Sequence, residues 1–92
     1  MGRYANKTEL AGRLQLVMTR ALNVPPETPP AKLVMGDLKA WDSLNHVLMM
    51  MEIESAFDIE ISSQDLPEWT SFAIVLDGLA AMLGSEDGEV LA

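Results

Sequence analysis

The sequence predicts an all-α fold: a small four-helix bundle of three main helices and one short helix, with a long loop between the first and second helices. Apolar residues recur at helical spacing in three segments, residues 8–22, 44–57 and 72–83. The stretch that alternates polar and apolar residues, 58–61, has no second strand to pair with. The 92 residues suffice for one modest core. We therefore expect one helical domain over residues 1–84, followed by a flexible acidic tail over residues 85–92.

The first predicted helix spans residues 8–22. Its apolar residues share one face, at Leu10, Leu14, Val17, Met18 and Ala21. Thr8 is a suitable N-cap, and Glu9 suits the positive end of the helix dipole. We expect Arg13, Gln15 and Arg20 to be solvated and the helix to serve as scaffold.

A long loop, residues 23–42, follows the first helix. Its four prolines between residues 25 and 30 remove amide donors and favour extended backbone, so the helix cannot continue. We expect a short helical turn near residues 31–35 and a return to the start of the second helix. A loop of this length in so small a domain is often functional. Trp41 is expected to anchor it by burying its ring.

The second helix is unusual because it is apolar on two sides. It follows a polar turn that ends in Asp42 and Ser43, either of which can cap it. At about 100° per residue, one side carries Leu44, Val47, Leu48, Met51 and Ser55, and the opposite side carries Met50, Ile53 and Phe57. A chain of this length can hardly bury a helix all round. We therefore expect the second side to be buried and the first to be offered to a partner.

The next segment is predicted to return the chain across the core. Residues 58–61 are expected to form an extended connector that places Ile59 and Ile61 in the core. Residues 62–66 are expected to form one short helical turn, which Pro67 stops.

The last helix is predicted over residues 72–83. Thr70 or Ser71 is its expected cap, and Gly84 is well placed to end it. Its expected apolar face consists of Phe72, Val75, Leu76, Leu79, Met82 and Leu83.

The net charge of −8 is distributed unevenly. Every Lys and Arg precedes Ser43, whereas residues 43–92 carry ten acidic residues. This half is expected to repel nucleic acid and anionic membranes and to attract basic surfaces, although a role in solubility explains it equally well. No apolar run approaches the ~20 residues that span a bilayer, and residues 1–6 lack the features of a signal peptide or myristoylation site. We expect a soluble, cytoplasmic monomer without membrane insertion.

The sequence offers little for catalysis or metal binding, so we expect no enzymatic activity. The absence of cysteine excludes thiolate metal sites and a cysteine nucleophile. His46 is the only histidine and has no acidic partner at a suitable spacing, which favours a surface or partly buried residue without chemistry. The acidic residues Glu52, Glu54, Asp58 and Glu60 match neither an acid–base pair nor a calcium loop, so we interpret them as a solvated face.

Ser43 is the candidate functional residue. It lies where the long loop meets a helix with a surplus apolar face, so we expect its hydroxyl to be accessible. The free N–H groups and the dipole of a helix N-terminus favour a phosphate there. Asp42 opposes a second negative charge, but a phosphodiester carries only one. The alternative is that Ser43 acts only as a helix cap.

The chain resembles the acyl carrier proteins over almost its whole length. The resemblance rests on Asp42-Ser43-Leu44, the hydrophobic helix that follows, and Phe57-Asp58-Ile59-Glu60-Ile61. Trp41 gives the Trp-Asp-Ser-Leu variant that dedicated carriers show. The resemblance implies that Ser43, between Asp42 and Leu44, receives 4′-phosphopantetheine from coenzyme A through a separate phosphopantetheinyl transferase that uses Mg²⁺. The terminal thiol of this arm would hold an acyl group as a thioester.

The resemblance also implies partners: acyl-transferring, ligase or synthase enzymes of fatty-acid, polyketide or other specialised lipid synthesis, with basic or apolar docking patches. The implied partner-binding residues are Leu44, Asn45, Leu48, Met51, Glu52 and Ser55. Three of them depart from the family pattern, because Asn45 replaces the usual Asp, and Leu48 and Ser55 occupy customary acidic positions. These departures favour an apolar docking face and a particular pathway rather than bulk fatty-acid synthesis.

Two alternatives remain open from the sequence. A peptidyl or aminoacyl carrier usually has a Gly-Gly pair before the serine, and residues 39–42 contain none. A non-covalent interaction module would dock a partner on the apolar face and use Ser43 only as a cap. For a carrier, the sequence also leaves open whether the acyl chain is sheltered between the helices or left in solvent.

Overall fold

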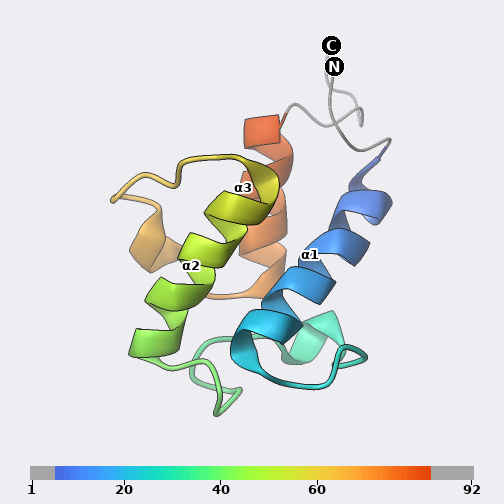
Figure 1. Ribbon diagram of the computed structural model, residues 1–92, viewed down its shortest axis with the longest axis vertical. Helices are drawn as coiled ribbons and strands as arrows, with labels where there is room; N and C mark the ends of the chain where they lie inside the picture. The colour runs from blue at the N-terminus through green and yellow to red at the C-terminus, as the bar shows by residue number, and fades with distance from the viewer. Residues whose placement is uncertain (1–5, 84–92) are drawn as a thin grey trace.

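The computed structural model describes residues 6–83, which fold into three α-helices and two short 3-10 turns (Figure 1). The elements are α1 (Lys7–Leu22), η1 (Pro30–Lys32), α2 (Ser43–Phe57), η2 (Leu66–Glu68) and α3 (Phe72–Leu83). No sheet forms within this part of the chain, where the β-type pairing is limited to two isolated bridges. The all-α prediction is confirmed. Gly84 and the predicted tail, 85–92, lie outside the described residues.

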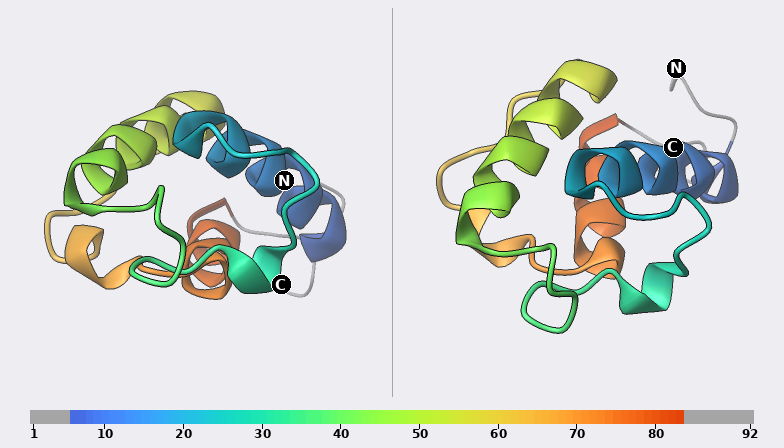
Figure 2. Two further views of the ribbon diagram at one scale, coloured as in Figure 1. Left: turned by 90° about the horizontal axis from the view of Figure 1, so that it is seen from below. Right: turned by 60° about the horizontal axis from the view of Figure 1, so that its bottom comes forward.

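The three helices form a compact globule in which α1 packs against both α2 and α3. α1 runs in the opposite direction to the other two helices, so the C-terminal end of α1 and the start of α2 lie at the same end of the molecule (Figure 1). The loop of residues 23–42 crosses this end (Figure 2). Two backbone bonds tie it to the start of α3, from the Met35 N–H to the Thr70 carbonyl and from the Phe72 N–H to the Leu33 carbonyl, each 2.9 Å long.

The core fills the space between the helices and receives side chains from every helix and from the loops. Its buried apolar residues are Leu10, Leu14, Val17, Met18, Leu22, Leu33, Trp41, Met49, Met50, Ile53, Phe57, Ile61, Trp69, Phe72, Val75 and Leu79. The predicted burial of the Met50 side of α2 is therefore confirmed, as is that of Trp41. Ile61 is buried and Ile59 is half-buried against the core, as expected for the connector. Met82 is instead 43% exposed, because it lies on the outer side of α3.

The helix caps agree with the predictions for α3 and differ for α1. The Ser71 hydroxyl accepts a hydrogen bond from the Ile74 N–H at 3.2 Å, which is an N-cap bond of the expected kind. The cap of α1 is Asn6 and not Thr8, because the Asn6 side-chain oxygen accepts from the Glu9 N–H at 2.8 Å. Asn and Thr both have a suitable acceptor, so the choice depended on where the chain enters the helix.

The prediction that the Gln15 side chain is solvated is wrong. Its side-chain amide donates to the carbonyl of Thr28 at 2.8 Å and to that of Pro26 at 3.3 Å. Prolines cannot donate backbone hydrogen bonds, so the loop carbonyls around them need donors from elsewhere. Gln15 supplies one and holds the proline-rich loop against α1.

The short helix is displaced from its predicted position. Residues 62–65 form turns, in which the Ser62 hydroxyl accepts from the Asp65 N–H at 3.1 Å. The 3-10 turn η2 then contains Pro67 instead of ending before it. Proline fits near the start of a helical turn, where its missing N–H would have had no partner. The turn predicted near residues 31–35 lies slightly earlier, in η1.

The close approach of α3 to Trp69 depends on Gly78, and we expect Gly78→Ala to destabilise the fold. A Cβ at position 78 would lie 2.8 Å from the Trp69 Cε2, and Trp69 is buried. Overpacking of this kind should lower the free energy of unfolding by about 1–3 kcal/mol in urea titrations.

Gly12→Ala in α1 is the matched control, because a Cβ there meets no atom within 4 Å. The higher helix propensity of alanine should raise the free energy of unfolding by up to about 1 kcal/mol. Equal effects of the two substitutions would contradict the packing that we describe around Trp69.

Candidate functional site

The start of α2 is capped by Asp42. One carboxylate oxygen of Asp42 accepts from the Asn45 N–H at 2.9 Å, and its backbone carbonyl accepts from the His46 N–H at 2.8 Å. Ser43 is thus the first residue of the helix, and the capping role considered for it belongs to its neighbour. Because the side chain that satisfies the helix end is that of Asp42, the Ser43 hydroxyl is left for other contacts.

The Ser43 side chain is exposed, and its hydroxyl forms no hydrogen bond to any of residues 6–83. The first four N–H groups of a helix lack intrahelical acceptors further back along the chain. Here Asp42 satisfies those of Asn45 and His46, so the N–H groups of Ser43 and Leu44 remain available beside the hydroxyl. The helix dipole adds a positive partial charge at this end. The site suits one negative charge attached to Ser43.

A buried chain of polar contacts fixes this helix end in the bundle. The Trp41 indole lies nearly parallel to the His46 ring, with centroids 5.9 Å apart, and its Nε1–H donates to His46 Nδ1 at 3.0 Å. An indole N–H is only a donor, so Nδ1 must accept, and the proton of the neutral imidazole lies on Nε2. Nε2–H then donates to the Leu66 carbonyl at 2.6 Å.

These contacts join the loop before Ser43, the first turn of α2 and the start of η2. The sequence favoured a surface or partly buried position for His46, but its side chain is buried, and its contacts give it a structural role. A second contact acts nearby, since the Asn45 side-chain amide donates to the Ala40 carbonyl at 2.7 Å. The sequence signal for the contact between Trp41 and His46 was a single histidine five residues after a tryptophan that was expected to be buried.

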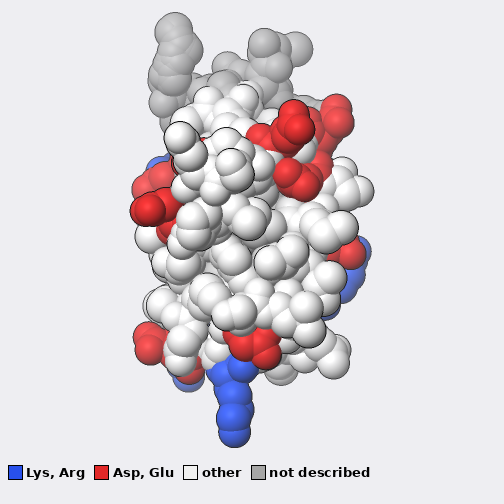
Figure 3. Space-filling view, turned by 90° about the vertical axis from the view of Figure 1, so that its left-hand side faces the viewer, with Lys and Arg blue, Asp and Glu red and all other residues white. Residues whose placement is uncertain are grey.

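The exposed face of α2 is apolar. Leu44, Val47, Leu48 and Met51 are 68%, 45%, 49% and 59% exposed. Ser55 and Glu52 are exposed beside them, whereas Asn45 is half-buried by its contact with the loop. Figure 3 views the side of the molecule on which α2 lies, and a broad uncharged surface runs along it between charged ends. We call Leu44, Val47, Leu48 and Met51 the apolar stripe.

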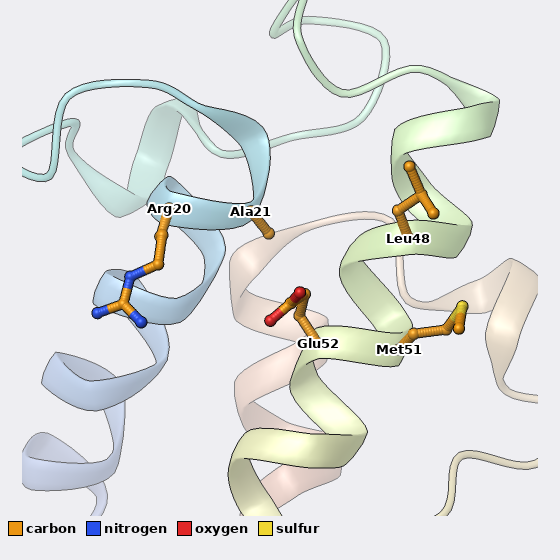
Figure 4. A pocket seen from close by; sticks show the side chains of 5 residues that line it. All are labelled: Arg20, Ala21, Leu48, Met51 and Glu52. Carbon is orange, nitrogen blue, oxygen red and sulfur yellow. The ribbon is translucent and has the colours of Figure 1, made fainter.

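A hollow of about 360 Å³ borders the apolar stripe, between α2 and the last turns of α1 (Figure 4). Arg20 and Ala21 of α1 line it together with Leu48, Met51 and Glu52 of α2. Leu48, Met51 and Glu52 were predicted to bind partners, and the structure brings them together. Arg20 and Ala21 were expected only in scaffold, because periodicity within one helix does not show which neighbour it will face.

Other possible kinds of site have no support in the described residues. No group of three or more His, Cys, Asp or Glu side chains within residues 6–83 could hold a metal ion. None of the helices there is both long enough and apolar enough to cross a membrane. Comparisons with protein-family models, with curated proteins and with solved structures found no match to the chain.

Replacing the cap should destabilise the protein more than replacing the candidate functional serine. We expect Asp42→Ala to lower the free energy of unfolding by about 0.5–2 kcal/mol, since the Asn45 N–H loses its acceptor. Ser43→Ala should change it by no more than about 0.5 kcal/mol, because an exposed hydroxyl without a hydrogen bond is lost. Chemical denaturation of both variants measures the difference. A larger loss from Ser43→Ala would contradict the assignment of the cap.

The buried contact between Trp41 and His46 can be measured by a double-mutant cycle. His46→Leu should cost about 1–3 kcal/mol by leaving the Trp41 N–H and the Leu66 carbonyl without partners. Trp41→Phe alone should also destabilise, but in the His46→Leu background it removes an unpaired donor and should cost less. Additive effects in urea titrations would show that the two rings act independently. Val47→Ala, at an exposed position of the same helix, is the control.

Proposed function

We propose that this protein is an acyl carrier. Acyl intermediates would be held as thioesters on a 4′-phosphopantetheine arm attached to the Ser43 hydroxyl and delivered to enzymes of fatty-acid, polyketide or other specialised lipid synthesis. The observation that supports the proposal best is the state of Ser43: exposed, free of hydrogen bonds to residues 6–83, and first in a helix that another residue caps. A carrier of this kind needs no catalytic groups of its own.

The residues around Ser43 suit the phosphodiester of such an arm. Its single negative charge would lie beside the N–H groups of Ser43 and Leu44 and at the positive end of the α2 dipole. One oxygen of the Asp42 carboxylate accepts from the Asn45 N–H, so this residue holds the helix end beside the attachment point. A separate transferase would take the hydroxyl proton while the Ser43 oxygen attacks the phosphorus next to the pantetheine in coenzyme A. The pyrophosphate bond would break, and adenosine 3′,5′-bisphosphate would leave. When attached, the arm supplies a thiol, which the chain itself lacks because it has no cysteine.

The carrier proposal also accounts for the architecture at the helix end. In this proposal the molecule is a four-helix carrier bundle, with η2 in the place of the short helix and the long loop leading to the attachment point. The contact of His46 with Leu66 keeps that point in a fixed position relative to η2. A rigid attachment point lets partner enzymes find the arm by docking on the protein surface. We infer that the protein is a monomer in the cytoplasm, where coenzyme A and the transferase would be present.

The apolar stripe is the proposed docking surface for these enzymes. Leu44, Leu48 and Met51 are exposed along α2 from its first turn to beyond its middle, with Glu52 and Ser55 beside them. Partners would combine apolar contacts with basic groups that approach the acidic residues. Asn45 belongs to the helix end and not to this surface, because its amide donates to the Ala40 carbonyl. An aspartate there could not make that bond, which gives this departure from the family pattern a structural reason.

Direct attachment of the arm tests the proposal. After incubation with coenzyme A, Mg²⁺ and a promiscuous phosphopantetheinyl transferase, the intact mass should increase by one phosphopantetheine. Ser43→Ala should show no increase, although it should remain folded. Ser63→Ala, which replaces an exposed serine outside α2, should be modified as fully as the native protein.

No increase in the mass of the folded protein would contradict the proposal. The apolar stripe would then favour the other candidate function, a non-covalent module that docks a partner helix or groove. Modification followed by transfer of aminoacyl groups instead of fatty acyl groups would favour a peptidyl or aminoacyl carrier.

A further inference from the structure

We propose that the hollow between α1 and α2 receives the distal end of the phosphopantetheine arm. Arg20 and Glu52 would bind the amide of the arm that lies nearest its thiol. This inference rests on the proposed attachment at Ser43 and adds a resting position for the arm on the protein's own surface. The hollow is lined by Arg20, Ala21, Leu48, Met51 and Glu52 (Figure 4).

The hollow is within reach of Ser43. Leu48 and Met51 follow Ser43 by five and eight residues, so they lie roughly 8–12 Å further along α2 at a rise of 1.5 Å per residue. An extended arm of about thirteen bonds between phosphorus and thiol spans roughly 15 Å, at ~3.5 Å for every three bonds. The path must also turn part of the way around α2, passing Leu44. This length brings the far end of the arm, and not its middle, to the hollow.

The chemistry of the hollow matches the end of the arm. Ala21, Leu48 and Met51 offer an apolar surface to methylene groups. Glu52 points from α2 towards α1, whereas the Arg20 side chain extends along α1 at the edge of the hollow (Figure 4). Within residues 6–83 neither side chain has an ion pair or hydrogen bond. A secondary amide has an acceptor on one edge and a donor on the other. Arg20 would donate to the carbonyl oxygen of the arm's amide, and the N–H of that amide would donate to the Glu52 carboxylate.

A second hollow, of about 320 Å³, provides a comparison. It is lined by Leu16, Thr19, Arg20, Val24 and Pro26, all from α1 and the loop that follows it. It has an exposed apolar residue and the same arginine, but it has no residue from α2 and no carboxylate. Of these two hollows, only the first combines a positive and a negative side chain with the helix that carries Ser43, so the arm should enter that one.

This position would link the arm to partner docking. Leu48 and Met51 belong both to the hollow and to the apolar stripe. A partner that covers these side chains would displace the end of the arm and release the thiol or thioester towards its active site. In the absence of a partner, the arm would cover part of the exposed apolar surface.

Nuclear Overhauser contacts in the arm-bearing protein test the inference. The protein is labelled with ¹³C, given an unlabelled arm by the transferase, and verified by intact mass. Contacts between arm methylenes and the methyl groups of Ala21, Leu48 and Met51 are expected. Methyl groups of Leu16 and Val24, which line the second hollow, should show none. Contacts limited to residues beside Ser43, such as Leu44 and Val47, would overturn the inference.

A pair of charge substitutions supplies a second test. Arg20→Ala combined with Glu52→Ala removes the proposed donor and acceptor and should abolish the contacts with Ala21 in protein whose attached arm is verified by intact mass. Arg13→Ala combined with Glu60→Ala removes the same charges at exposed positions away from the hollow and should leave the contacts unchanged. Contacts that survive the first pair would overturn the roles of Arg20 and Glu52. A protein that gains no mass at all would overturn the proposed function and this inference together, whereas a loaded protein without the contacts would overturn only the latter.

Discussion

The chain of contacts from Trp41 through His46 to the Leu66 carbonyl is the constraint on which the end of the molecule that carries Ser43 depends. The three residues belong to segments that share no regular hydrogen bonding: the end of the long loop, the first turn of α2 and the start of η2. Buried polar groups are costly unless they are paired, so each contact favours keeping the two segments that it joins in place. Ser43 lies between Trp41 and His46 in sequence and takes its position from this arrangement.

The same arrangement separates the tasks of neighbouring residues. Asp42 caps the helix, Asn45 holds the Ala40 carbonyl, and His46 is buried. Each polar side chain around Ser43 therefore has a structural partner, whereas Ser43 itself has none among residues 6–83. We regard this contrast as more informative than the exposure of a serine alone. Exposed serines at helix starts are common, and most of them serve as caps.

The sequence predicted the helices well because their signals are local. The spacing of apolar residues gave all three to within a residue or two, and the two-sided pattern of α2 correctly separated its buried side from its exposed side. Contacts between segments were not predictable in the same way. Gln15 was expected in solvent but serves the loop, His46 was expected nearer the surface, and Arg20 and Ala21 were not expected beside Glu52. Each of these outcomes depends on which element lies opposite, and local spacing carries no information about that.

The uncovered apolar stripe has a consequence for how copies of the protein meet one another. Four exposed apolar side chains on one helix would by themselves favour association between identical molecules. A net charge of −8 on a chain of 92 residues opposes that encounter, because every copy repels every other at low ionic strength. A basic protein experiences the opposite force at the same surface. The net charge therefore opposes association between identical molecules through the stripe and favours encounters with proteins of opposite charge.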